Sequence, residues 1–349
     1  MKKLKPIEVR KNKTIKELLE EMMDTAYQGK SLARAYDILR KMINDEDTTI
    51  LLGYSGSLST AGQWKLINWL IENNFVDIIV STGANISEDI IEAMGYHYYQ
   101  CPPDYDDTAL FKEGYNRYYD VLGSESEYME MTELIAGFIL TLRENYPYSS
   151  REFLYEFGLW LKKKNINSVV ATAAVNKIPI FCPAIVDSPY GDAALIAKSR
   201  GFRLILDNVK DYTEFMSLSE SVKETGVIYL GGGVPKDFIQ LFSVSADLMY
   251  EERKVPNRVN LNSRKDTDES YYPHKYAVQI TADSPQWGGL SGCTFDEAIS
   301  WGKESDNGNY VQCYCDSTIA LPIITQALKD SDLNKRKKNP GLIKALFDN

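Results

Sequence analysis

The residues best suited to covalent chemistry lie in one glycine-rich stretch, 288–303, which ends in Trp301-Gly302-Lys303. On the helix predicted after the glycines, Glu297 and Trp301 stand four positions apart and share one face. Gly302 leaves Lys303 free to turn inward. A lysine amine is a nucleophile only when neutral, and desolvation against an aromatic ring favours that form and makes imine formation feasible. Spacing alone leaves a second reading open, a surface lysine favoured by the negative end of a helix.

Small, hydroxyl-bearing and acidic residues follow five of the apolar runs that we predict to be strands. These positions are Ser55 and Ser57, Thr82 with Glu88, Asp187 with Asp192, Gly231–Gly233, and Asp316 with Ser317. Glycines let a backbone approach a phosphate closely, and a helix N-terminus favours negative charge. Taken singly, the glycines also fit a structural turn and each aspartate a helix N-cap. Because ligands bind beyond the carboxyl ends of the strands in an open α/β sheet, the five loops together favour a pocket for ribose hydroxyls or an ammonium group.

The elements that must position these loops alternate between strand and helix. Strands are predicted at 48–55, 76–82, 178–185, 203–207, 227–230, 276–282 and 311–314, and helices over 60–74, from 87, over 127–146 and over 149–164. The runs are continuously apolar rather than alternating, which is typical of strands covered on both faces. The pattern predicts an α/β fold with a doubly wound, mostly parallel sheet, helices on both faces and a helical insertion within about 105–165.

The ends of the chain differ from this alternating middle. Residues 1–45 are predicted to form a helical N-terminal arm, residues 46–335 the α/β domain, and residues 336–349 a C-terminal tail. The segment 253–273 is polar and without periodicity, so we expect a surface loop there.

Composition narrows the class of protein. The 349 residues carry a formal net charge of −10, which argues against a nucleic-acid partner because phosphate binding needs lysine and arginine. No apolar run approaches about 18 residues, so we expect neither a membrane span nor a membrane partner. Five cysteines without a Cys-x-x-Cys pair indicate reduced core thiols in a cytoplasmic protein. Two histidines, His97 and His274, leave almost no basis for a metal site or a Ser-His-Asp site.

The stretch Ser300-Trp301-Gly302-Lys303, preceded by Asp296-Glu297-Ala298, resembles the active-site segment of deoxyhypusine synthases. The resemblance continues through 181–184, 191–192, 230–234 and from 76–77 to 88–89, so it covers roughly 45–330 in the same order. It implies a homotetramer with a Rossmann-like, NAD-binding fold. It also implies transfer of the aminobutyl group of spermidine through a lysine imine, followed by reduction of the product with the same NADH.

Carried over by position, the resemblance assigns a role to each matching residue. Lys303 matches the imine-forming lysine, and Glu297 and Trp301 match residues that line the polyamine site. Asp192 and Glu88 match acidic contacts to the amine, Glu88 also near the cofactor. The matches to cofactor contacts are Ser55, Thr82, Asp187, Gly232 and Asp316, with Ser57 and Ser317 assigned alongside them in the same loops.

Several positions depart from the family pattern. Asp237 stands where the family has a histidine, and we assign it to the substrate site as a proton acceptor in place of that histidine. Trp287 and Leu290 replace two acidic residues, Ser87 replaces the first of a pair of acids, and Gln279 replaces a tyrosine. These changes resemble the bacterial deoxyhypusine synthase-like branch. Because bacteria lack the hypusine-bearing translation factor, resemblance to this branch favours a small amine acceptor, giving homospermidine or a related polyamine, over a protein acceptor.

Three other functions stay open from the sequence. An NAD-dependent amine dehydrogenase would share the cofactor loops, and a non-catalytic polyamine-binding protein would explain the lost acidic residues. NAD-dependent deacylation ranks last, because neither histidine lies in a motif suited to that chemistry.

Overall fold

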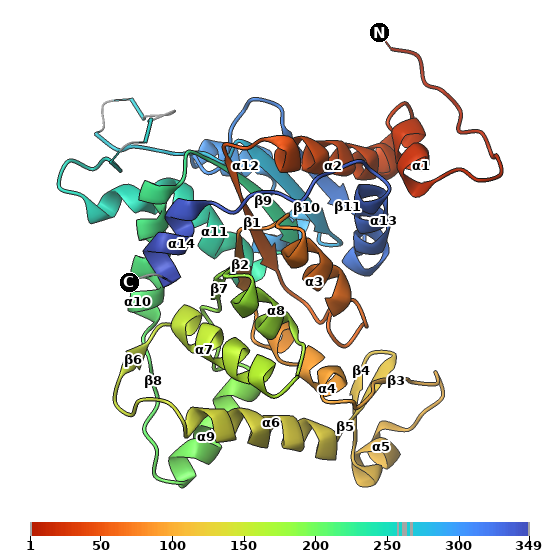
Figure 1. The fold of residues 1–349 in the computed structure, drawn as a ribbon. Coiled ribbons are helices and arrows are strands. Elements are labelled where there is room, and N and C mark those ends of the chain that lie inside the picture. The colour runs from red at the N-terminus through yellow and green to blue at the C-terminus, as the bar shows by residue number, and fades with distance from the viewer. Residues whose placement is uncertain (1, 257, 260–263, 266–267, 348–349) are drawn as a thin grey trace. The chain divides into compact units, whose positions relative to one another are not determined.

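The computed structural model of the chain describes residues 2–256, 258–259, 264–265 and 268–347. It divides into two compact units. The first comprises residues 1–55, 69–80 and 212–349, and the second comprises residues 56–68 and 81–211. Figure 1 labels the helices and strands of the chain.

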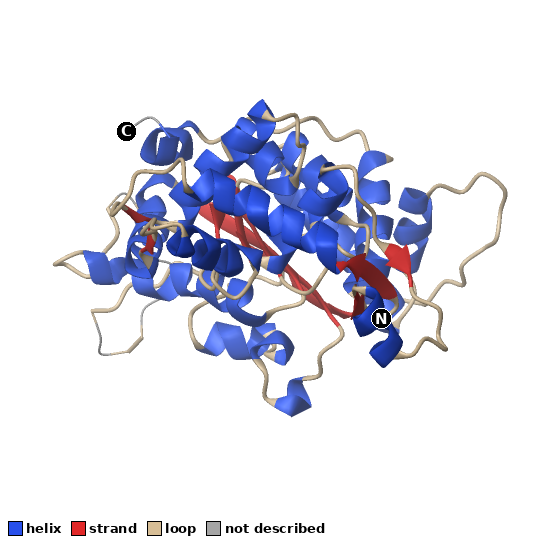
Figure 2. Cartoon of the chain, turned by 90° about the horizontal axis from the view of Figure 1, so that it is seen from below, coloured by secondary structure: helices blue, strands red, loops and turns tan. Residues whose placement is uncertain are grey.

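A parallel sheet forms the centre of the first unit. Its strands lie in the order β11-β10-β9-β1-β2. They are β1 (Thr48–Tyr54), β2 (Ile78–Ser81), β9 (Glu224–Leu230), β10 (Tyr276–Thr281) and β11 (Tyr310–Tyr314). Figure 2 shows the strands in red, lying alongside one another. All seven residues of β1 are buried, which agrees with the continuous apolar run in its sequence.

Helices cover both faces of this sheet. Leu52 of β1 lies around a small apolar cavity with Leu39 of α2 (Tyr27–Asn44) and Ile324 of α13 (Ser317–Lys329). The next residue, Gly53, faces the other way, because a Cβ there would lie 3.0 Å from Ile239 of α11 (Gly233–Ser245). Successive residues of a strand point to opposite faces, so α2 and α13 cover one side and α11 the other. The predicted doubly wound α/β arrangement is therefore confirmed.

The remaining helices of the first unit lie around this core. They are α1 (Ile15–Met22), α12 (Phe295–Ser300), α14 (Pro340–Phe347) and the 3-10 turns η2 (Leu218–Ser221), η3 (Ala246–Met249), η4 (Pro285–Trp287) and η5 (Leu290–Gly292). The helix α1 begins with a capping box between Thr14 and Glu17 and packs against α2 and α13. Two helices, α3 (Trp64–Glu72) and α10 (Asn208–Ser217), contribute residues to both units.

The second unit is mostly helical, with two small sheets. Its helices are η1 (Ala84–Ile86), α4 (Asp89–Ala93), α5 (Asp107–Glu113), α6 (Glu125–Ile139), α7 (Ser150–Lys163), α8 (Val169–Val175) and α9 (Pro189–Ser199). Its strands are β3 (Tyr99–Gln100), β4 (Tyr115–Tyr118), β5 (Val121–Ser124), β6 (Pro147–Tyr148), β7 (Ile180–Phe181) and β8 (Ile205–Leu206). Tyr190 of α9 packs edge-on against Phe153 and Phe157 of α7 and donates a 2.7 Å hydrogen bond to the Ile86 carbonyl. This aromatic core holds α9 on α7.

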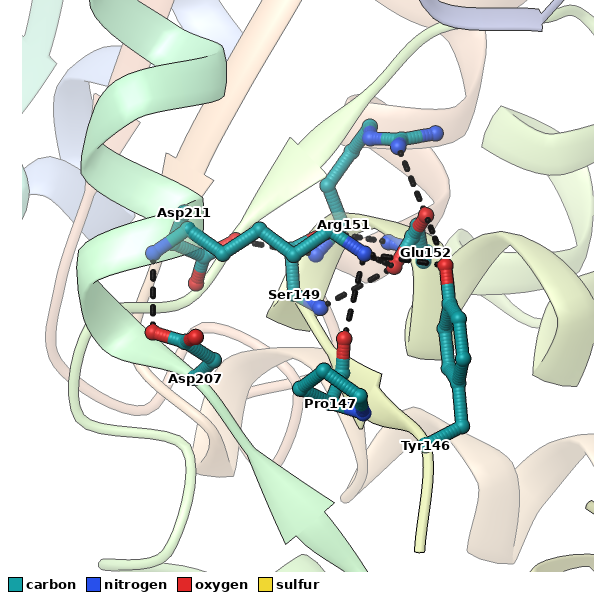
Figure 3. A network of polar contacts seen from close by, with 8 residues as sticks. Tyr146, Pro147, Ser149, Arg151, Glu152, Asp207 and Asp211 are labelled. Carbon is teal, nitrogen blue, oxygen red and sulfur yellow. Dashed lines mark hydrogen bonds and ion pairs between the residues drawn. The ribbon is translucent and has the colours of Figure 1, made fainter. Parts of the chain in front are cut away.

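A polar network ties the start of α7 to the β6–β8 pair (Figure 3). Glu152 completes a capping box with Ser149 and accepts bonds from the Tyr146 hydroxyl at 3.2 Å and the Lys210 ammonium at 2.5 Å. The same ammonium donates to the Pro147 carbonyl at 3.1 Å. Every partner of Glu152 here is part of the local frame, so we assign the network to structure rather than to chemistry.

Several predicted boundaries differ from the structure. The run 178–185 forms a strand only at Ile180–Phe181, because the Cys182 N–H donates to the Ser150 hydroxyl at 2.7 Å and the chain then turns. The run 203–207 is a strand only at Ile205–Leu206. The region predicted as helical, 105–165, also contains the antiparallel pair β4–β5, which the prediction missed.

Two further expectations concern the loop and the membrane. The described part of the predicted loop 253–273 contains no helix or strand, while positions 257, 260–263 and 266–267 lie outside the described residues. Among the residues that the structure describes, none of the helices has both the length and the apolar composition that a bilayer crossing requires.

Candidate active site

Lys303 is turned inward by the residue before it. The helix α12 ends at Ser300, and Gly302 takes the left-handed φ of 78°. A Cβ at Gly302 would lie 2.5 Å from the Tyr271 ring, so glycine is needed both for this backbone conformation and for the close approach. The Lys303 backbone is then held by an N–H bond to the Ala298 carbonyl, 3.0 Å, and by the His274 N–H, which donates to the Lys303 carbonyl at 3.0 Å.

The Lys303 side chain is only 12% exposed. Its ammonium lies 3.2 Å from an Asp237 carboxylate oxygen and 5.4 Å from the centre of the Trp301 ring. The Trp301 ring is 56% exposed and the Asp237 side chain 43% exposed. A shielded amine with one carboxylate partner and one aromatic wall is therefore present where the sequence placed the imine-forming lysine.

A pocket of about 250 Å³ opens beside this amine. Its lining residues are Pro285, Gly288, Gly289, Leu290, Cys293, Glu297, Ala298, Trp301 and Lys303. Glu297 is the one carboxylate among them, and its N–H is capped by the Thr294 hydroxyl at 3.1 Å. The size and the mixture of one acid with apolar walls suit a short aliphatic amine.

The residues of the first unit that were predicted to contact a cofactor follow the carboxyl ends of its strands. The Ser55 hydroxyl, after β1, accepts the Gly232 N–H at 3.1 Å. Gly232 follows β9, and a Cβ there would lie 2.4 Å from the Ser291 Cα. After β11, Asp316 caps α13 by accepting the Thr318 N–H at 2.7 Å, and the Ser317 hydroxyl donates to the Ile280 carbonyl at 3.4 Å. Asp316 thus has the N-cap role that the sequence left open.

In the second unit, two of the predicted residues, Glu88 and Ser57, are in direct contact. The Glu88 side chain is 5% exposed and accepts the Ser57 hydroxyl at 2.9 Å. Burial raises the pKa of the Glu88 carboxyl to about 7, and the bond from Ser57 offsets this only in part. A carboxyl that titrates near neutral pH can exchange a proton with an amine under ordinary conditions.

Tyrosines surround this carboxyl, and the sequence did not single them out. The Tyr98 hydroxyl donates to the Glu88 carbonyl at 3.0 Å. Burial first, and then the charges of Asp192 and Glu88, raise the pKa of Tyr128 to about 12. Burial followed by the Glu88 charge raises the pKa of Tyr118 as well. Asp192, exposed in the first turn of α9, is therefore near enough to Glu88 for both to act on one tyrosine.

The other two predicted residues of this unit have local partners. The Thr82 hydroxyl accepts a 3.3 Å bond from the Asn85 amide, whose oxygen accepts the Leu58 N–H at 3.0 Å. Asp187 is exposed, and its N–H donates to the Ala184 carbonyl at 3.0 Å. A turn of small residues is thus present at Thr82.

The prediction from the sequence assigned no role to Lys236, Gln312 or Cys293. Lys236 has no exposed surface, Gln312 lies on β11, and Cys293 lines the pocket. One signal was available for Lys236, a lone lysine three positions after the last of three glycines and before an apolar run. Nothing local in the sequence marks Gln312.

Comparisons with known proteins show which family the chain belongs to. The family described as deoxyhypusine synthase matches residues 17–328. A Methanosarcina mazei protein named "Probable deoxyhypusine synthase 2" is 40% identical over 337 residues, covering 96% of this chain and 92% of its own. A "Deoxyhypusine synthase-like protein" of Elusimicrobium minutum is 36% identical over 349 residues, covering 98% of this chain and 88% of its own.

A solved structure shares the fold. The crystal structure titled as a "putative deoxyhypusine synthase" from Entamoeba histolytica aligns with a TM-score of 0.62 at 20% identity, covering 96% of this chain and 99% of that one. The sequence matches span nearly the whole of both chains and include archaeal and deoxyhypusine synthase-like relatives. This chain therefore belongs to the deoxyhypusine synthase family and is a transferase that moves an aminobutyl group.

Proposed function

We propose that this protein transfers an aminobutyl group from a polyamine such as spermidine or putrescine to a small amine, through an imine on Lys303 and with NAD as cofactor. The observation that carries the proposal is the 12% exposed Lys303 amine beside a pocket with a single lining carboxylate. The family supports the aminobutyl transfer. The geometry of the pocket supports Lys303 as the imine-forming residue and a small amine as the acceptor.

The residues at the carboxyl edge of the first unit fit a dinucleotide. Gly232 leaves no room for a Cβ, and a Cβ at Gly233 would meet nothing within 4 Å. Both glycines lie at the start of α11, a helix of 13 residues whose N-terminus favours a phosphate. Ser55, Ser317 and Asp316 supply the hydroxyls and the acid. For Ser57, Thr82, Glu88 and Asp187 of the second unit, the assignment to the cofactor rests on the family resemblance alone.

NAD, when bound, supplies an acceptor for the hydride that leaves the carbon next to the donor amine and a donor for the hydride that returns, so the transfer has no net oxidation. The chain's own task is to hold the amines and to exchange the leaving group. By the family resemblance, Glu88 and Asp192 would bind ammonium groups through charge-assisted bonds. In the first unit, Glu297 lines the pocket beside Lys303 and would bind an ammonium there.

Lys303 must lose its proton before it can attack. Asp237, whose carboxylate lies 3.2 Å from the Lys303 ammonium, would take this proton as the substrate ammonium enters. The Lys303 nitrogen then bonds to the imine carbon of the substrate, and the bond from that carbon to the departing amine breaks, with the released proton passing to the departing nitrogen. The acceptor amine next attacks the same carbon and frees Lys303.

The acceptor that fits is a small amine. Leu290 and Trp287 stand where the family has acids, and the pocket beside Lys303 holds about 250 Å³. A homospermidine-type product follows if the acceptor is putrescine. A homotetramer and a cytoplasmic location are further parts of this proposal and follow from the family resemblance.

A borohydride trap tests the proposal. With NAD and spermidine, reduction by borohydride should leave a stable four-carbon adduct on Lys303, detected by peptide mass analysis. Lys303→Ala should give no adduct and no product, while Lys275→Ala, which loses a lysine paired with Asp45 at 2.9 Å, should behave as wild type. Absence of an adduct in the wild type, with Lys303→Ala fully active, would defeat the proposal.

A simple amine dehydrogenase remains the second candidate, because the cofactor loops and Glu88 would serve it equally. It would form NADH far in excess of enzyme, whereas the transferase returns each hydride. A non-catalytic polyamine-binding protein, the third, would bind amines without NAD and would form no adduct. Product analysis with putrescine, spermidine and agmatine separates the three.

A further inference from the structure

A buried polar network lies behind the amine pocket, built by three side chains from three elements. Lys236 of α11 has no exposed surface, and its ammonium donates to the Gln279 side-chain oxygen at 3.0 Å and to the carbonyls of Leu290 at 3.2 Å and Cys293 at 2.7 Å. The Gln279 amide, on β10, donates to the carbonyls of Gly231 and Ser291, both at 2.8 Å.

Gln312 completes the network from the neighbouring strand. It is the direct register partner of Gln279 in the β10–β11 pair. Its amide donates to the Gln279 oxygen at 2.7 Å and to the Cys293 carbonyl at 2.9 Å, and its own oxygen accepts the Phe295 N–H at 3.0 Å. We call Lys236, Gln279 and Gln312 the hub.

Every donor of the hub has an acceptor. The ammonium uses three N–H groups, and each glutamine uses both of its own. Fully satisfied buried networks hold one geometry, since any displacement leaves a polar group unpaired in a low dielectric. Burial lowers the pKa of Lys236, and the charges of Glu304 and Glu297 act in the opposite direction. The direct partners of its ammonium are one amide oxygen and two carbonyl oxygens.

The backbone groups that the hub holds belong to the site. Leu290 and Cys293, whose carbonyls it binds, also line the pocket beside Lys303. Ser291, bound by Gln279, accepts the Gly233 N–H on its hydroxyl at 3.1 Å and closes against Gly232. The hub therefore joins the wall of the amine pocket to the glycine turn proposed for the cofactor.

We propose that Gln279 and Gln312 are positioning residues that, with Lys236, set where the 290–293 wall stands relative to Lys303 and to Gly232. The inference rests on the proposed function and deepens it. Gln279, where the family has a tyrosine, directs its amide at the backbone rather than into the pocket. The substrate groups then bind to a wall whose position depends on the two glutamines.

The test uses the full chain with Gln279→Leu and the milder Gln312→Leu. The control is Thr325→Val, which also removes a buried polar group of the first unit, a hydroxyl bonded to the Leu321 carbonyl at 2.8 Å. We expect Gln279→Leu to raise the spermidine concentration for half-maximal borohydride trapping about tenfold or more, and to weaken NAD binding several-fold, because buried amides lose their partners. The maximal trapping at saturation should remain, and Gln312→Leu should shift both curves less.

Hydrogen exchange at the Phe295 amide gives a readout that needs no chemistry. Gln312→Leu removes its acceptor and should speed its exchange at least tenfold, while Thr325→Val should leave it unchanged. Trapping and binding curves of both glutamine variants that coincide with those of Thr325→Val would overturn the proposal. Missing adduct in the wild type, with exchange at Phe295 still dependent on Gln312, would instead contradict the proposed function and leave the hub standing.

Discussion

The charged side chains around Lys303 and those around Glu88 have different surroundings. Around Lys303, in the first unit, each cation has its partners, and the backbone that carries them is fixed by Gly302 and the hub. Around Glu88, in the second unit, carboxyls are buried with few donors, and their pKa values are raised by that burial. One region holds the proposed nucleophile in a fixed position, and the other holds acids whose pKa values are raised to about 7. We therefore expect the reaction at Lys303 to depend on the position of that side chain, and amine binding at Glu88 to depend on pH.

The substitution Gly302→Ala tests whether the reaction depends on the position of Lys303. A Cβ at that φ of 78° would lie 2.5 Å from Tyr271, so the turn must shift and carry Lys303 out of its place. We expect trapping of the Lys303 adduct to fall about a hundredfold, because misplacing a reacting group by about 1 Å has that effect. The measurement is the rate of adduct formation at saturating spermidine and NAD.

Gly308→Ala is the matched control for this change. Its φ is also 78°, but a Cβ there would meet nothing within 4 Å, so it carries the same backbone strain without the contact. Equal losses in the two variants would show that strain alone, and not the position of Lys303, accounts for the effect.

The substitution Glu88→Gln tests whether amine binding depends on the charge of Glu88. With a pKa of about 7, Glu88 is mostly neutral at pH 6 and mostly charged at pH 8, so its attraction for an ammonium grows as the pH rises. The wild-type KM for the amine should fall by up to about tenfold per pH unit below pH 7 and level off above it. In Glu88→Gln the KM should be about tenfold higher at pH 8 and nearly flat with pH.

Glu133→Gln serves as control, because Glu133 is an exposed acid of the same unit, paired with Arg200 at 2.7 Å. It should keep the wild-type profile. A wild-type KM that does not change from pH 6 to 8 would separate Glu88 from amine binding and leave it a structural role beside Ser57.

Much of the first region could be predicted from the sequence because its signals are local. Gly302 next to Lys303, and three glycines after an apolar run, identify a turn and a glycine cradle without knowledge of the fold. The hub could not be predicted, since Lys236, Gln279 and Gln312 meet only after α11, β10 and β11 have packed. A glutamine in an apolar strand carries no local mark of its partners.

The second region was predicted less completely for the same reason. Glu88 and Asp192 were found through the family resemblance, but Tyr118 was not, because the β4–β5 pair that carries it was missed. Residues Tyr115–Arg117 are exposed in the structure, so that strand lacks the apolar pattern from which strands are predicted. Exposed edge strands of four residues leave almost no signal in a sequence.

The last expected effect concerns stability. Glu304, next to Lys303, is a carboxyl of the first unit that behaves like those of the second, because full burial raises its pKa to about 8. Between the unfolded value near 4.5 and pH 8 the unfolded chain has released this proton while the folded chain keeps it, so the free energy of unfolding falls as the pH rises. The slope from one such group is at most about 1.4 kcal/mol per pH unit.

Glu304→Gln should remove this contribution, since an amide cannot ionise and can still bond to Gln240. Urea unfolding at pH 5.5 and pH 7.5 should show a smaller loss of stability in the variant than in the wild type. The remaining slope would belong to buried acids such as Asp89, whose pKa is raised to about 7 in the same direction. Equal slopes in the two proteins would mean that Glu304 is already ionised in the folded state. The region around Lys303 would then hold a buried carboxylate charge beside the charges of Lys236 and Lys303. The position of Lys303 alone would not account for its reactivity.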